Sequence, residues 1–186
     1  MTTIGRSHAA HLEHVEAPGS MLTTTAAKAL AVLRFATGFV FLWAFLDKTF
    51  GFGYSTTSER AWINGGSPTK GFLSSLEAGP LKGFFNAIAG NPVADWAFML
   101  GMLGIGLALI LGIGLRVAAV SATAMMALMW AAEWPLTSGS SNPIVDYHVV
   151  YAISAILIAL TYAGHTWGLG RFWTKLPLVQ KNRWLI

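Results

Sequence analysis

The sequence predicts an all-α integral membrane protein: four transmembrane helices in an antiparallel bundle, with a long extracytoplasmic loop between the first and second helices. Composition is the first observation. Of the 186 residues, 54% are hydrophobic and only 11% are charged, and the mean hydropathy is +0.56. A soluble domain normally carries about a quarter charged residues. The second observation is that the apolar residues form four long runs, which cross a bilayer as helices because a helix satisfies its own backbone hydrogen bonds.

Each apolar run is close to the roughly 20 residues that cross the hydrocarbon core. The predicted spans are residues 29–46, 93–115, 117–134 and 144–164. In the second span, Gly104, Ala108 and Gly112 are spaced four residues apart, which predicts close approach of a neighbouring helix. The other predicted segments are a polar N-terminal tail of residues 1–25, a loop of residues 47–92 and a basic C-terminal tail of residues 171–186, so that residues 26–170 form the membrane domain.

Basic residues outside the spans predict the orientation. With four spans, both termini and the turn between the second and third spans lie on one side. That side contains Arg6, Lys28, Arg116, Arg171, Lys175, Lys181 and Arg183. Because cytoplasmic segments are enriched in Lys and Arg, we expect a multi-pass protein of the cell membrane with both termini in the cytoplasm. The scattered basic residues form no face that would bind nucleic acid.

Ionisable residues within spans are costly in a membrane, and they indicate functional sites. Those near the outer ends of the predicted spans are Asp47, Lys48, Asp95, Glu133, Asp146 and His148. A structural role is the alternative for several of them. Asp95 and Asp146 follow Asn-Pro pairs, where a carboxylate stabilises the start of a helix, and Asp47 and Lys48 can mark the membrane interface.

Three of these residues, Glu133, Asp146 and His148, are the candidate catalytic residues. Glu133 lies between Trp130 and Trp134, so its carboxyl group needs a proton or a cationic partner, for which Lys48 and Arg60 are the candidates by level. His148 can take up or release a proton near neutral pH, although a hydrogen bond between helices is the alternative.

The sequence excludes several cofactors. It contains no cysteine, which excludes disulfides, thiolate catalysis and iron–sulfur ligation. Haem is not expected, because His148 and His165 lie at opposite ends of one span and no other span contains a histidine. We expect no metal either. Redox chemistry would therefore belong to a bound small molecule or to another subunit.

The order of the motifs resembles a known family. LRFATGFVFLWAFLDK in the first span, LGIGLALILGIGLR in the second, a histidine near the start of the fourth span and WINGGSPTKGFL in the first long loop together resemble the DoxX/DoxD family. The loop is particularly similar to the DoxD-like branch, which includes the membrane subunit of thiosulfate:quinone oxidoreductase. The resemblance covers residues 28–170 approximately.

The resemblance implies a membrane subunit of a quinone-linked oxidoreductase of the respiratory chain. Thiosulfate or a related sulfur compound would be oxidised at the outer face, and quinone would accept the electrons. Lys48, Arg60 and Lys70 are the cations expected to bind the dianion. The expected partners are quinone, membrane lipid and other subunits of the complex. The alternative is a non-catalytic accessory or scaffold subunit of a larger membrane redox complex. A transporter is disfavoured, because the sequence has no inverted repeat.

Aromatic side chains of the first and fourth spans are expected to flank the quinone ring or a lipid. The candidate residues for this quinone- or lipid-binding role are Arg34, Phe45, Trp130 and Tyr151. Arg34 has a structural or lipid-anchoring role as its alternative. The loop WINGGSPTKGFL is predicted to be a lid: Trp62 and Phe72 would dip into the interface on either side of a Gly-Gly-Ser-Pro turn, with a structural cap as the alternative.

Overall fold

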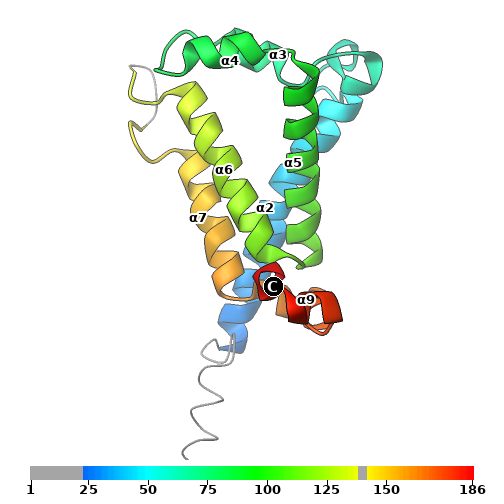
Figure 1. Ribbon diagram of the computed structural model, residues 1–186. Helices are drawn as coiled ribbons and strands as arrows, with labels where there is room; N and C mark the ends of the chain where they lie inside the picture. The colour runs from blue at the N-terminus through cyan, green and yellow to red at the C-terminus, as the bar shows by residue number, and fades with distance from the viewer. Residues whose placement is uncertain (1–22, 138–141) are drawn as a thin grey trace, which may run out of the picture.

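The computed structural model describes residues 23–137 and 142–186, and within these ranges the chain forms helices and turns without a strand. The all-α class is therefore confirmed (Figure 1). The long helices are α2 (Thr24–Phe50), α5 (Pro92–Leu111), α6 (Leu115–Glu133) and α7 (Tyr147–Leu160). Most of the predicted N-terminal tail, residues 1–22, lies outside the described residues, and α2 already begins at the end of that tail.

Within the described ranges, three helices, α2, α5 and α6, are long and apolar enough to cross a membrane. Helix α7 is apolar but has only 14 residues, about 21 Å at 1.5 Å per residue. It is shorter than the predicted span of residues 144–164 for two reasons. The Asp146 side chain caps its start by accepting hydrogen bonds from the backbone N–H groups of His148 and Val149, and Tyr162 ends it with a left-handed backbone (φ 51°).

Two other helix ends differ from the predicted spans. Gly51 (φ 69°) ends α2 beyond the predicted boundary at residue 46, and Gly112 (φ 73°) ends α5 three residues before the predicted boundary, whereas Trp134 (φ 45°) ends α6 at the predicted boundary. Apolar residues such as Ile113 continue beyond the turn at Gly112. The hydropathy pattern therefore extends past the point at which the backbone leaves the helix.

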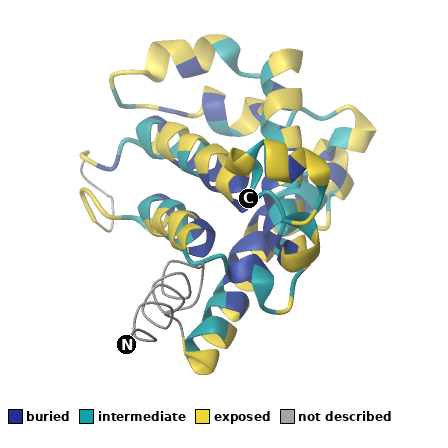
Figure 2. Ribbon diagram, turned by 60° about the horizontal axis from the view of Figure 1, so that its bottom comes forward, coloured by how far each residue is buried: buried dark blue, intermediate teal, exposed yellow. Residues whose placement is uncertain are grey.

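The four long helices pack together in a bundle in which α2 lies against α5 and α7, and α6 lies against the same two helices. Their contact faces are buried and their outer faces are exposed (Figure 2). The buried cluster between them includes Phe41, Ile105, Leu109, Ala122 and Ile158. The exposed faces carry large apolar side chains, which suits contact with lipid: Val32, Phe39, Leu100, Val120, Ile153 and Leu160.

Of the predicted small residues, Gly112 does lie against a neighbouring backbone, since a Cβ on it would be 2.7 Å from Cα of Gly164, but other glycines bring α2 and α5 together. A Cβ atom on Gly106 would lie 2.8 Å from the backbone nitrogen of Leu42, and one on Gly38 would lie 2.9 Å from Cβ of Leu109. A Cβ on Gly104 would meet nothing within 4 Å, so the predicted role of Gly104 is wrong. The contact face of α5 passes through Gly106, and spacing alone could not distinguish these two positions.

The loop between α2 and α5 is ordered and contains the short helices α3 (Lys70–Ser74) and α4 (Lys82–Ile88). Oδ1 of Asp95 accepts hydrogen bonds from the Ser67 hydroxyl (3.0 Å), the Thr69 backbone N–H (3.0 Å) and the Thr69 hydroxyl (2.6 Å). The Trp62 ring packs edge-on against Trp96, with 4.6 Å between the ring centroids. The WINGGSPTKGFL segment is thus fixed to the first turns of α5.

The predicted C-terminal tail is folded. Helices α8 (Gly170–Trp173) and α9 (Pro177–Lys181) pack beside the turn between α5 and α6 (Figure 1). The backbone N–H of Arg116 donates to the carbonyl of Ile186 (3.2 Å), and Nε1 of Trp173 donates to that of Leu185 (2.7 Å). Aromatic and aliphatic side chains between the basic residues allow this segment to pack rather than remain extended.

Candidate functional site

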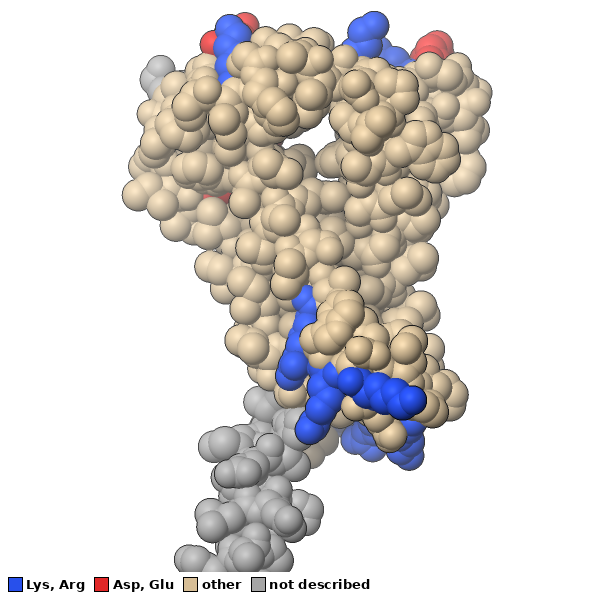
Figure 3. Space-filling model, viewed as in Figure 1, with Lys and Arg blue, Asp and Glu red and all other residues tan. Residues whose placement is uncertain are grey.

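A large apolar cavity lies between α5 and α6, beneath α3 and α4. The two long helices meet at their short connection and diverge towards the loop, where α3 and α4 bridge the gap (Figure 1). The cavity has a volume of about 530 Å³, and Figure 3 shows an opening beneath the loop helices. Its apolar lining includes Phe72, Phe85, Phe98, Ile105, Met125 and Leu128. Both the volume and the apolar lining are typical of a small-molecule site.

Two charged side chains, Lys48 and Glu133, line this cavity. Lys48 lies in the last turn of α2 and Glu133 is the last residue of α6, so the two come from different helices. The sequence suggested Lys48 as a cationic partner for Glu133, and the structure places both on one cavity. Thr69 and Ser121 are polar lining residues, but the Thr69 hydroxyl already donates to Asp95.

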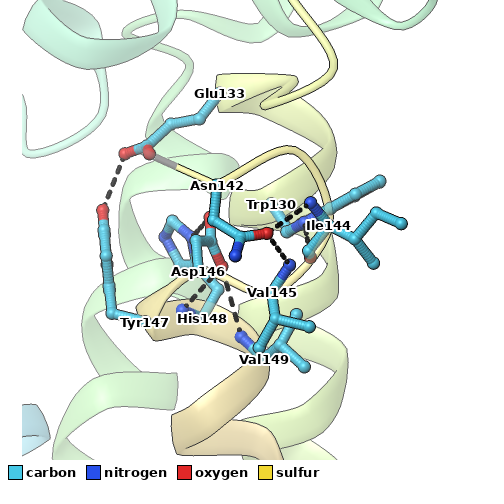
Figure 4. A network of polar contacts seen from close by, with 9 residues as sticks. All are labelled: Trp130, Glu133, Asn142, Ile144, Val145, Asp146, Tyr147, His148 and Val149. Atoms are coloured by element: carbon cyan, nitrogen blue, oxygen red, sulfur yellow. Dashed lines mark hydrogen bonds and ion pairs between the residues drawn. The ribbon is translucent and has the colours of Figure 1, made fainter. Parts of the chain in front are cut away.

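An acid–histidine pair lies next to Glu133, at the start of α7 (Figure 4). The His148 side chain is fully buried, and its Nδ1 lies 3.0 Å from Oδ2 of Asp146. The other carboxylate oxygen of Asp146 accepts from the N–H groups of His148 (2.9 Å) and Val149 (3.3 Å). The carboxylate therefore holds both the helix start and the imidazole, and favours the tautomer with its proton on Nδ1.

The second ring nitrogen of His148 has no partner. Nε2 is buried and makes no hydrogen bond within the described part of the chain. With the proton on Nδ1, this nitrogen carries a lone pair that can accept a proton or a hydrogen bond. A buried polar atom without a partner costs free energy, and so it favours a bound molecule or water beside it.

Tyr147 connects Glu133 to this pair. Its hydroxyl donates to Oε1 of Glu133 over 2.8 Å, and its ring lies 4.0 Å from the His148 ring, centroid to centroid (Figure 4). One carboxylate oxygen each from Glu133 and Asp146 and one ring nitrogen of His148, the atoms that could bind a metal ion, all lie within 4.8 Å of one another. The three predicted catalytic residues are thus brought together.

One imidazole and two carboxylates form a donor set that zinc or another divalent transition metal accepts. A metal was not expected from the sequence. The oxygens of Asp146 are already bound to backbone N–H groups and to the His148 ring, whereas Glu133 is exposed and accepts a hydrogen bond from the Tyr147 hydroxyl. A metal at this cluster would consequently compete with the helix cap for the oxygens of Asp146, whereas a hydrogen bond to Nε2 of His148 would leave the cap intact.

The three cations predicted to bind a sulfur oxyanion do not meet at the cavity. Lys48 lines it, while Arg60 and Lys70 are exposed and are not part of its lining. Arg60 belongs to the short 3₁₀ helix Ser58–Arg60, and Lys70 begins α3. Because both residues belong to the loop and are exposed, their charges lie on its surface.

Several charged residues near the helix ends have structural partners. Asp47 is buried and accepts from the N–H of Tyr54 (3.3 Å), the N–H of Ser55 (2.9 Å) and the Ser55 hydroxyl (2.7 Å). Asp95 holds the loop. For these two carboxylates, the geometry supports the structural alternative.

The four predicted quinone- or lipid-binding residues do not line the apolar cavity. Arg34 is fully buried, and its two terminal nitrogens donate to the carbonyls of Leu109, Ile110 (2.6 Å), Thr166 (3.3 Å) and Trp167 (2.9 Å).

Arg34 therefore joins the end of α5 to the segment after α7, which supports its structural alternative. Trp130 donates to the carbonyl of Ile144 (3.1 Å), and Tyr151 packs against the central cluster. Phe45 is partly buried on α2.

Sequence reasoning missed Tyr147 and the location of the cavity. The sequence shows that Tyr147 is next to His148, but its hydrogen bond to Glu133 on α6 depends on how α6 and α7 pack. The cavity was expected beside the first and fourth spans, whereas α5 and α6 form its walls. The aromatic residues of the loop, Phe72 and Phe85, were the available signal, because they are apolar residues outside the spans.

Comparison of the chain with protein-family models, with curated proteins and with solved structures finds no match. The function is therefore inferred from the residues and their geometry.

Proposed function

We propose that the chain is the membrane subunit of a quinone-linked oxidoreductase of the DoxX/DoxD type, and that the quinone ring occupies the cavity between α5 and α6. The observation that carries this proposal is the cavity itself: about 530 Å³, predominantly apolar, with one lysine and one glutamate on its lining. A quinone needs such a site, because its ring is apolar and its two carbonyl oxygens accept hydrogen bonds.

In this proposal the four long helices form a four-span antiparallel bundle, and α7 lies within the fourth span, residues 144–164. The exposed apolar faces of α2, α5, α6 and α7 contact lipid. The basic residues of the C-terminal segment and the α5–α6 turn face the cytoplasm, following the distribution of Lys and Arg. The cavity and the acid–histidine cluster then lie towards the outer face of the cell membrane.

Reduction of a quinone to a quinol takes up two electrons and two protons. Lys48 would donate a hydrogen bond to one quinone oxygen, which stabilises the negative charge that develops there. Glu133 would deliver a proton from the cavity wall, with Tyr147 and the Asp146–His148 pair behind it. These groups lie at the end of the bundle where the loop gives access to water, so protons can be resupplied.

The electrons would come from thiosulfate, two molecules of which give one tetrathionate and two electrons. The chain has no cysteine to carry them. Of the three cations expected to bind the sulfur oxyanion, Lys48 lines the cavity, whereas Arg60 and Lys70 do not. That observation favours the accessory-subunit alternative for the sulfur step: a second subunit would complete the oxyanion site while this chain holds the quinone.

The test is binding and reduction of decylubiquinone by the purified protein, alone and with its co-purifying subunits. Ala97→Phe fills the cavity, and Leu100→Phe, on the exposed side of the same helix, is the matched control. We expect Ala97→Phe to weaken quinone binding by at least about tenfold, or about 1.4 kcal/mol, and the control to bind normally.

Glu133→Gln should bind quinone normally but reduce it about a hundredfold more slowly, as expected for loss of a general acid. Equal binding by Ala97→Phe and Leu100→Phe would refute the cavity assignment. If both preparations bound quinone but neither reduced it when thiosulfate was added, the quinone site would stand and thiosulfate would be refuted as the electron donor.

A further inference from the structure

A second cavity, of about 460 Å³, lies at the opposite end of the molecule, between the first turns of α2 and the segment that follows α7. Thr24, Lys28 and Leu30 line it from α2, and His165, Thr166 and Arg171 line it from the other side. It shares no lining residue with the cavity between α5 and α6. Its lining is polar and cationic, whereas that of the first cavity is apolar.

The charges at this end are predominantly positive. All six acidic residues within the described ranges belong to the end that carries α3 and α4: Asp47, Glu59, Glu77, Asp95, Glu133 and Asp146. None of them lines the second cavity. Figure 3 shows basic side chains gathered at the lower end of the molecule and acidic ones towards the other end. Lys28 and Arg171 thus face the cavity without a carboxylate from the described part of the chain.

The His165 imidazole and the Arg171 side chain both line this cavity. Burial lowers the pKa of the His165 imidazole, and the nearby positive charge of Arg171 lowers it further. Lys28 and Arg171 bring two positive charges to the same lining, and a bound anion relieves the repulsion between them. The hydroxyl groups of Thr24 and Thr166 add neutral hydrogen-bond donors to the same lining.

The wall of the cavity is held rigidly. Arg34 donates to the carbonyls of Thr166 (3.3 Å) and Trp167 (2.9 Å), both of which belong to lining residues. Gly164 lies so close to Gly112 that a Cβ atom on it would come within 2.2 Å of the Gly112 carbonyl oxygen. A wall fixed in this way loses little freedom when a ligand binds.

Apolar side chains adjoin the cavity. Val32, four residues after Lys28 and therefore on the same face of α2, is 57% exposed, and Leu160, just before the lining residue Thr161, is 72% exposed. Trp167, another lining residue, is 58% exposed, and tryptophan is enriched at the membrane interface. A charged pocket bordered by lipid-facing side chains suits a molecule with a phosphate at one end and acyl chains at the other.

We propose that this cavity binds a phosphate group between Lys28 and Arg171, and that its source is the headgroup of an anionic phospholipid. Arg171 pairs with two phosphate oxygens, Lys28 supplies a second cation, and the threonine hydroxyls donate hydrogen bonds. The acyl chains lie along Val32 and Leu160. The site goes beyond the quinone function and does not depend on it.

The experiment measures the thermal unfolding midpoint of the purified chain in a neutral detergent, with added phosphatidylglycerol, phosphatidylcholine or inorganic phosphate. For the wild type, phosphatidylglycerol at ten times its Kd should raise the midpoint by about 3–6 °C, and phosphatidylcholine should not. The double variant Lys28→Gln/Arg171→Gln should lose the shift. The matched double variant Lys175→Gln/Lys181→Gln removes the same charge outside the cavity and should keep it.

Arg171→Lys should retain part of the shift, which separates loss of the site from loss of the fold. Circular dichroism and a single symmetric gel-filtration peak provide a second check that each variant is folded. A shift with inorganic phosphate but none with phosphatidylglycerol would retain the phosphate site and overturn its lipid source. Equal loss of the shift in the two double variants, or equal shifts with both lipids, would overturn the site itself.

Discussion

The end of the molecule that carries α3 and α4, the loop end, contains the acidic residues of the described ranges, and the opposite end, the terminal end, is predominantly basic. Each end nevertheless contains one charged side chain that is held by hydrogen bonds within the fold and another that lines a cavity. At the loop end, the Asp95 carboxylate is bound by hydroxyl and backbone donors, while Glu133 lines the apolar cavity. At the terminal end, Arg34 is bound by backbone carbonyls, while Arg171 lines the cationic cavity. The difference teaches that burial alone does not identify a functional charge. The number of hydrogen bonds that the fold supplies separates Asp95 and Arg34, which are held in place, from Glu133 and Arg171, which line cavities.

Arg34 gives the largest effect expected from this comparison. Arg34→Met removes every hydrogen bond to the carbonyls of Leu109, Ile110, Thr166 and Trp167, and leaves those carbonyls without that donor in a buried region. We expect the free energy of unfolding to fall by about 3–5 kcal/mol, as when one partner of a buried charged network is removed.

The measurement is denaturant or thermal unfolding in detergent, with Arg171→Gln at the same end as the control, which should change stability little. A loss below about 1 kcal/mol for Arg34→Met would show that Arg34 is not structural.

A matched pair of carboxylates sharpens the comparison at the loop end. Asp95→Ala removes three hydrogen bonds that attach the loop to α5, and we expect it to cost about 2–3 kcal/mol and to make the loop sensitive to protease. Glu133→Gln should change stability by less than about 0.5 kcal/mol, because Glu133 is exposed and can still accept from Tyr147.

Unfolding midpoints and limited proteolysis of the two variants measure this difference. If Glu133→Gln destabilised the chain as much as Asp95→Ala, the two carboxylates would not differ in kind.

The pH dependence of stability at the terminal end gives the smallest effect. The folded pKa of His165 is lowered by burial and by Arg171, whereas the unfolded value is about 6.5. The unfolded chain therefore binds the proton more readily. This contribution to stability is present above pH of about 6.5 and is lost as the pH falls from there through the folded pKa.

We expect the unfolding midpoint to fall between pH 7.5 and pH 5, and His165→Gln to flatten that fall. The same slope in the variant and the wild type would assign the pH dependence to other groups. Bound anionic lipid should also flatten it, because an anion beside His165 stabilises the imidazolium.

The sequence predicted the parts of the fold that depend on local composition. Three long apolar helices followed from the apolar runs, because the energetic cost of placing polar backbone and side chains in lipid is a local property. The predicted clustering of Asp47, Asp95, Glu133 and Asp146 at one end of the helices also follows from helix order alone. Helix ends were less accurate where the turns at Gly112 and Tyr162 occur within apolar sequence.

The parts of the site that could not be predicted depend on contacts between distant residues. Glu133 meets Tyr147 only because α6 and α7 pack side by side, and Lys48 reaches the cavity only because α2 ends beside it. Likewise, Arg34 was open to a ligand role in the sequence, and its carbonyl partners lie 75 to 133 residues away. Periodicity places such residues on a helix face, but only tertiary packing determines what that face contacts.

The short length of α7 has a consequence for the membrane around the protein. Helix α2 has 27 residues, about 40 Å, whereas α7 has 14, about 21 Å. The hydrocarbon core of a bilayer is about 30 Å thick. A bilayer that matched the length of α7, the helical part of the fourth span, would thin by roughly 9 Å beside it; otherwise the end of that helix would lie below the headgroups. Either adjustment brings water and headgroups towards Asp146 and His148. The unequal helices thus give the proposed bundle a thick side and a thin side, and the Asp146–His148 pair lies on the thin one.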